Sequence, residues 1–178
     1  MEIEFLMRNF GLLASRCVLG GYLAAHGSQK LFGAFGGRGL DATAAGFESM
    51  GLRPGKAVAT LAGVSELGGG LLTVTGIADP LGPLAISGAM AVAAAVHRKK
   101  GPLSQNGGFE LPLTNLALAI GIMSAGPGRF RLGPSLPKSL ARLTVLGALT
   151  VTGLSLSQLF RAKAVTLPQA NQGSAVEE

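Results

Sequence analysis

Three polar residues near the end of the first apolar stretch carry side chains that can bind a small polar group at a membrane surface. Tyr22, His26 and Lys30 follow one another at four-residue spacing, so in a helix they project from one face. A cation one turn from His26 favours the neutral imidazole, which suits hydrogen bonding to a neutral ligand such as a quinone carbonyl. Lys30 can instead serve as an interface anchor that reaches the lipid headgroups.

Glu66 and Arg16 are ionisable residues inside apolar stretches. An ionised carboxylate facing lipid costs about 2.5 to 3.5 kcal/mol, so we expect Glu66 to face protein. The residues three, four and seven positions from Glu66 are small, which lets a neighbouring backbone approach; they are Ala59, Ala62, Gly63, Gly69, Gly70 and Thr73. A buried polar or ionic contact that fixes helix register is the other interpretation of Glu66, and it applies equally to Arg16.

His97 and Glu110 stand at the borders of later apolar stretches and complete the candidate ligand-binding residues. Both also have plain structural interpretations. His97 can be an interface anchor, and Glu110 can be an acidic residue that the dipole favours at a helix N-terminus.

Few groups in the sequence can hold a metal ion or a redox cofactor. Cys17 is the only cysteine, so no intrachain disulfide and no cysteine-based zinc or iron–sulfur site can form. The sequence has no GxxxxGK[ST], HExxH or GxSxG motif. We therefore expect no metal site and no cofactor within the chain, with a quinone as the one small molecule that the candidates suit; no catalytic residue is assigned.

The composition predicts which elements position these residues. Only 13% of the 178 residues are charged, 48% are hydrophobic, and the mean hydropathy is +0.45. Soluble domains carry about twice that share of charged residues. Because the apolar residues are also grouped in long runs, the sequence predicts an all-α, polytopic transmembrane helical bundle with four core helices and a fifth C-terminal helix.

Five apolar runs are separated by polar or glycine-rich breaks, and they cover residues 10–33, 56–77, 81–96, 111–125 and 143–160. This pattern predicts four regions: an N-terminal segment 1–9, a four-helix membrane domain 10–129, a linker and fifth helix 130–160, and a disordered polar tail 161–178.

The net charge of +6 comes from basic residues placed in the breaks, which suits contact with lipid headgroups and argues against nucleic acid as a partner. With five alternating spans, eight basic residues fall on one side: Arg38, Arg53, Lys56, Arg98, Lys99, Lys100, Arg161 and Lys163. Five fall on the other: Arg8, Arg129, Arg131, Lys138 and Arg142. We therefore expect a multi-pass protein of the inner (plasma) membrane with the first side in the cytoplasm, and His26, Lys30, His97 and Glu110 near that side.

Three segments together resemble the DoxX family of small bacterial membrane proteins. They are RCVLGGYLAAHGSQKLFG at 16–33, GVSELGGG at 63–70, and residues 107–129, which include GGFELPL and GPGR. The resemblance implies a four-helix membrane domain in which His26, Lys30, Glu66 and Glu110 are the motif's polar positions. It also implies a link to redox and sulfur-stress systems, because some members resemble the small subunit of thiosulfate:quinone oxidoreductases.

These features favour an integral membrane subunit of a redox-associated complex, quinone- or sulfur-linked, that binds a small apolar ligand or a partner near one membrane face. The expected partners are the lipid bilayer and another membrane or membrane-associated redox protein, with homo-oligomers as a further arrangement. Two other interpretations stay open. One is an accessory subunit whose buried polar residues only specify packing, and the other is a small transporter with Glu66 as its proton site.

Overall fold

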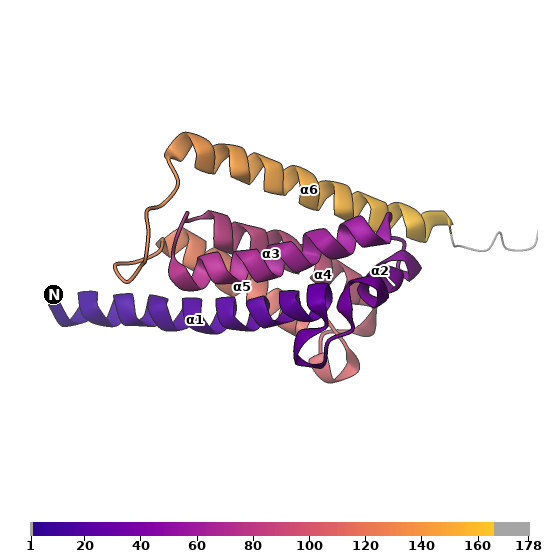
Figure 1. Cartoon of the computed structure of the whole chain (residues 1–178), viewed down its shortest axis with the longest axis horizontal. Helices are drawn as coiled ribbons and strands as arrows, with labels where there is room; N and C mark the ends of the chain where they lie inside the picture. Colours follow the sequence, from indigo (N-terminus) through magenta and orange to yellow (C-terminus); the bar gives the residue numbers. More distant parts are fainter. Residues whose placement is uncertain (1, 166–178) are drawn as a thin grey trace, which may run out of the picture.

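The computed structural model describes residues 2–165, and this part of the chain is all-helical (Figure 1). Its α-helices are α1 (Glu2–Phe32), α2 (Gly39–Ser49), α3 (Gly55–Thr75), α4 (Leu81–His97), α5 (Glu110–Ala125) and α6 (Lys138–Val165). Three single-turn helices lie in the connections: η1 (Ala34–Gly36), η2 (Arg98–Lys100) and η3 (Ser104–Asn106).

The helices α1, α3, α4 and α5 form the central bundle, and α6 lies along its outside against α4 (Figure 1). The buried core joins α1, α4 and α5 through Leu19, Leu23, Ile86, Met90, Ala119 and Ile122. We call the end that carries α2 the α2 end, and the end where α1 begins the N-terminal end. Because successive long helices alternate in direction, α1, α4 and α6 finish at the α2 end, where α3 and α5 begin.

Each predicted apolar run forms a helix, so the all-α bundle is confirmed. Three bounds differ from expectation. The helix α1 begins at Glu2, so residues 2–9 continue it. The helix α6 begins at Lys138, five residues before the fifth apolar run, and continues to Val165, five residues into the predicted tail. The rest of that tail, 166–178, lies outside the described residues. The helix α2 was not predicted, because its 11 residues are too few to show a clear period.

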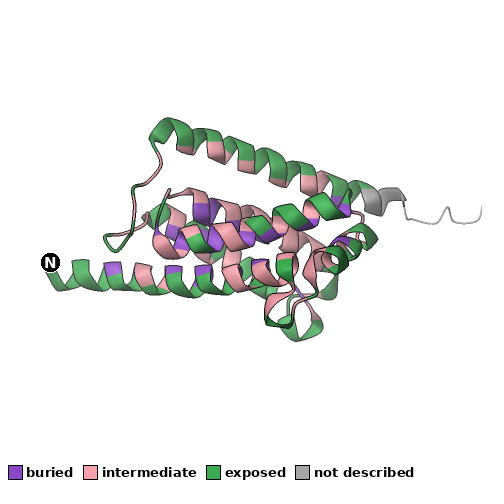
Figure 2. Ribbon diagram, in the orientation of Figure 1, coloured by how far each residue is buried: buried purple, intermediate pink, exposed green. Residues whose placement is uncertain are grey.

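Within residues 2–165, three helices are long and apolar enough to cross a membrane: α3, α4 extended through η2 to Lys100, and α6. The helix α5 is apolar but shorter, and α1 carries charged residues along its length. Large apolar side chains cover the outer faces, which Figure 2 shows as exposed; Leu143, Leu149 and Leu154 of α6 are 64%, 64% and 61% exposed. Together with the three helices of spanning length, an apolar surface of this extent indicates a membrane protein.

Close contact between α1 and α3 depends on glycine. A Cβ atom added at Gly70 would meet the carbonyl oxygen of Gly20 and would lie 2.7 Å from the backbone nitrogen of Ala24. A Cβ atom added at Gly27 would lie 2.6 Å from the carbonyl oxygen of Gly63. The two backbones therefore touch at two levels, as small residues allow in membrane helix pairs.

We expect Gly70→Ala to lower the free energy of unfolding by about 1–3 kcal/mol, because the added methyl group meets backbone that cannot turn aside. Gly68→Ala is the matched control on the same helix, since nothing lies within 4 Å of a Cβ atom there. Thermal unfolding in detergent, followed by circular dichroism, measures both variants. Equal midpoints for the two variants would contradict close α1–α3 packing.

Candidate functional site

Glu66 faces the interior of the bundle, as the cost of exposing a carboxylate to lipid predicts. The residue is 4% exposed, and its helical face is buried with it at Ala59, Gly63, Gly69, Gly70 and Thr73. This face packs against α1 and α4. The expectation that small residues around Glu66 form a packing surface is therefore confirmed.

Lys30 of α1 is the partner of Glu66. Its Nζ atom donates a hydrogen bond to Glu66 Oε2, and the two form an ion pair between side chains that are 26% and 5% exposed. Leu31 lies against Gly63, so the end of α1 is level with the residue one turn before Glu66 on α3. Side chains of a helix lean toward its N-terminus, which directs Lys30 deeper into the bundle and onto Glu66.

His26 is held in one orientation by its neighbour Gln29. The Nε2 amide of Gln29 donates to the carbonyl oxygen of Phe35, 3.4 Å away, and its Oε1 lies 3.0 Å from His26 Nδ1. Because a backbone carbonyl can only accept, Gln29 must present Oε1 to the ring, so Nδ1 carries the hydrogen. In the neutral form of the ring, the other nitrogen, Nε2, is then an acceptor.

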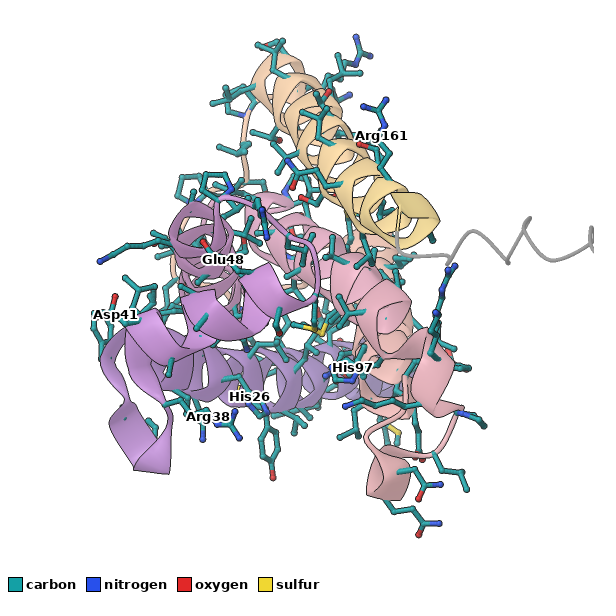
Figure 3. All side chains as sticks on the ribbon, turned by 90° about the vertical axis from the view of Figure 1, so that its right-hand side faces the viewer. His26, Arg38, Asp41, Glu48, His97 and Arg161 are labelled. Atoms are coloured by element: carbon teal, nitrogen blue, oxygen red, sulfur yellow. The ribbon has the colours of Figure 1, made fainter. Side chains whose placement is uncertain are left out.

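Tyr22 and His26 both lie on the exposed outer side of α1. Tyr22 is 68% exposed, and His26 is exposed one turn nearer the α2 end. Figure 3 views the molecule from that end and labels His26 on α1 and His97 on α4. Tyr22 and His26 thus form an exposed polar face on α1. The Lys30–Glu66 pair is more buried than this face.

His97 and Glu110 hold the loop between α4 and α5. His97 Nδ1 lies 2.7 Å from the carbonyl oxygen of Gly107, and Glu110 Oε2 accepts a hydrogen bond of 2.9 Å from the backbone nitrogen of Ser104. Both side chains share the α2 end with His26. Their described contacts are with their own loop, not with the ion pair.

Arg16 organises the opposite, N-terminal end, and its role was only partly predicted. The side chain is 2% exposed and donates to the last carbonyl groups of α3, with Nε 2.8 Å from Thr73 O and Nη2 2.6 Å from Val74 O. Its Nη1 donates to Pro127 O at 2.6 Å and Phe130 O at 2.7 Å. Burial in a polar contact was expected, but the partners are backbone carbonyls, for which the sequence carries no signal.

Asp79 lies in the turn between α3 and α4, at the same end as Arg16. Burial raises the pKa of its carboxyl group, and the positive charges of Arg16 and Arg131 act against that rise. Asn9 of α1 adds a further contact there, because its Oδ1 accepts a hydrogen bond of 2.7 Å from the backbone nitrogen of Arg129. This end is therefore a structural joint between α1, the end of α3 and the loop that follows α5.

Within residues 2–165, no group of three His, Cys, Asp or Glu side chains is placed to hold a metal ion. The arrangement at the α2 end offers instead an oriented imidazole acceptor, a phenol, and an ammonium group fixed by a buried carboxylate. These groups can accept and donate hydrogen bonds to a ligand with two or more oxygen atoms.

Comparison with known proteins gives one match. Residues 11–98 match the DoxX family model, from the third turn of α1 to the end of α4. The matched range contains Tyr22, His26, Lys30, Glu66 and His97, whereas Glu110 and the 107–129 segment lie beyond it. No curated protein and no solved structure matches the chain.

Proposed function

Because the chain belongs to the DoxX family of membrane proteins, we propose that it is a multi-pass subunit of a redox-associated complex in the plasma membrane and that it binds a quinol at its α2 end. The eight basic residues predicted for this side favour a cytoplasmic α2 end.

The orientation of His26 is the observation that carries this proposal. Gln29 fixes the Nδ1 hydrogen, so Nε2 accepts a hydrogen bond from a ligand hydroxyl group. In its neutral form, a ring held in this way suits the hydroxyl group of a quinol better than the carbonyl group of a quinone, which needs a donor. Tyr22, one turn away, offers a phenol that either donates or accepts.

The Lys30–Glu66 pair supports the same ligand from the inner side. Lys30 remains 26% exposed while it bonds to Glu66, so its other ammonium hydrogens are available to a second ligand oxygen. Glu66 keeps the ammonium group in place, and a fixed donor loses less entropy when the ligand binds. Oxidation of a bound quinol to the quinone would release two protons to water and pass two electrons to a redox group of a partner protein.

We expect His26→Ala to weaken the binding of decylubiquinol to the purified protein by about five- to tenfold, the value of one hydrogen bond of roughly 1 kcal/mol. Val18→Ala is the matched control, because Val18 is 56% exposed on α1 two turns earlier. Isothermal titration in nanodiscs, with thermal unfolding as a check on folding, measures both. An unchanged Kd in His26→Ala would rule out this site.

An accessory subunit without a ligand is the second candidate, and the Lys30–Glu66 pair favours it, since the two charges satisfy each other. On that function, His26→Ala and Lys30→Ala lower the amount of protein in the membrane and leave the activity per molecule unchanged. Complementation in cells, normalised to membrane protein level, separates the two functions.

A further inference from the structure

We propose that the first turns of α6 bind an anionic phospholipid, with the Arg142 guanidinium on the phosphate and an acyl chain in the groove beneath it. The groove has a volume of about 430 Å³ and is lined by Ala141, Arg142, Val145 and Leu146. It lies at the N-terminal end, away from His26 and Lys30, so this inference does not rest on the proposed quinol site.

The groove is lined by residues of α6 alone and is open to the surroundings, because α6 extends beyond the helix that supports it. The helices α4 and α6 run in the same direction, and a Cβ atom at Gly88 would lie 2.8 Å from Thr152 Oγ1, so these two residues are level. The helix α4 begins seven residues before Gly88, whereas α6 begins fourteen residues before Thr152. At a rise of about 1.5 Å per residue, the start of α6 therefore extends roughly 10 Å past α4.

Arg142 lies at the level where lipid headgroups are expected. The α6 sequence between Arg142 and Arg161 has 18 residues without a charge. Such a segment spans about 27 Å, close to the hydrocarbon thickness of a bilayer. The two arginines thus mark the two surfaces of the membrane. Val145 and Leu146 lie on the hydrocarbon side of Arg142, at the depth where a lipid acyl chain begins.

The charge around the groove selects an anionic lipid. The whole of α6 contains no Asp or Glu, and Lys138 lies one turn before Arg142 on the same helix face. The acidic group in the adjoining turn, Asp79, interacts electrostatically with Arg16 and Arg131, which offset its negative charge. A guanidinium binds phosphate with two parallel hydrogen bonds, and the lack of nearby carboxylates disfavours the cationic headgroup of a zwitterionic lipid.

The α2 end of α6 lacks these features and provides the matched control. There Leu159 is 1% exposed and Arg98 stacks on the Phe160 ring at 4.6 Å, so α6 is packed against α4. Arg161 is also an exposed arginine at a membrane interface. A general attraction between arginine and lipid acts at both ends, whereas a groove for an acyl chain acts only at Arg142.

The test uses the full chain purified in a mild detergent, with bound lipids extracted and counted by mass spectrometry. We expect phosphatidylglycerol to remain with the wild type and with Arg161→Gln. It should fall at least fivefold in Arg142→Gln, which removes the charge, and in Ala141→Phe, which fills the groove. Circular dichroism confirms that all variants fold.

A second measurement uses only the wild type, so it does not depend on whether the variants fold. Adding phosphatidylglycerol to delipidated wild type should raise the unfolding midpoint by several degrees, and phosphatidylcholine or inorganic phosphate should not. Equal lipid loss in Arg142→Gln and Arg161→Gln would overturn the proposal in favour of a general lipid annulus. Stabilisation by inorganic phosphate alone would overturn it in favour of an anion site without an acyl chain.

Discussion

Arg16→Met is expected to lower the stability of the bundle strongly by loosening its N-terminal end. The arginine donates four hydrogen bonds to backbone carbonyls, two at the end of α3 and two in the loop after α5. Each charge-assisted bond contributes roughly 1.5 to 3 kcal/mol, so losing even two independent ones lowers the free energy of unfolding by about 3 to 6 kcal/mol. That is a large part of the stability of a typical domain.

Two further substitutions separate the hydrogen-bond geometry from the charge. Arg16→Lys keeps the charge, but an ammonium group is a single point and cannot reach α3 and the loop together, so we expect an intermediate loss. Arg8→Met removes an exposed arginine two turns earlier on the same helix and should have little effect. Unfolding midpoints in detergent rank the three. A lysine variant as stable as the wild type would show that charge alone matters.

The Arg16→Met variant should also respond differently to pH. Burial already raises the pKa of Asp79, so the folded state loses stability as this carboxyl group ionises with rising pH. Without the positive charge of Arg16, that pKa rises further, and the loss extends to higher pH. The difference in unfolding midpoint between about pH 5 and pH 8 should grow in Arg16→Met and shrink again when Asp79→Asn is added.

The helices and the burial of Glu66 could be predicted from the sequence because each depends on local pattern. Apolar runs of helical length between glycine- and proline-containing breaks set the bounds of α3, α4 and α5 to within two residues of expectation. The inward orientation of Glu66 could be predicted because a charge facing lipid is costly and because its helical face is made of small residues. Neither argument needs knowledge of the partner helix.

Contacts between helices could not be predicted, because they depend on register. Lys30 and Glu66 meet only because glycine contacts fix how α1 lies against α3 and because side chains lean toward the helix N-terminus. From their positions in the apolar runs alone, Lys30 is expected near a membrane interface and Glu66 in the middle of a span. His97 and Glu110 were grouped correctly at one end, yet their partners are loop backbone atoms.

Removing Lys30 should destabilise the protein more than removing Glu66, although both changes break the same ion pair. In Lys30→Met the carboxylate of Glu66, 5% exposed, loses its partner inside the bundle, which costs about 3 to 5 kcal/mol. In Glu66→Leu the ammonium group of Lys30, 26% exposed, can turn toward the headgroups of the α2 end. We therefore expect the second variant to lose roughly half as much stability.

The double variant Lys30→Met/Glu66→Leu completes the test. With both charges gone, the two apolar side chains fill the same space, and replacing a buried ion pair in this way is often neutral. We expect the double variant to recover most of the stability lost in Lys30→Met, and a thermodynamic cycle on the unfolding midpoints measures the coupling. Decylubiquinol binding then separates stability from function: on the proposed function the stable double variant binds at least fivefold more weakly. If that variant is stable and binds the quinol as well as the wild type does, the ion pair has only a packing role.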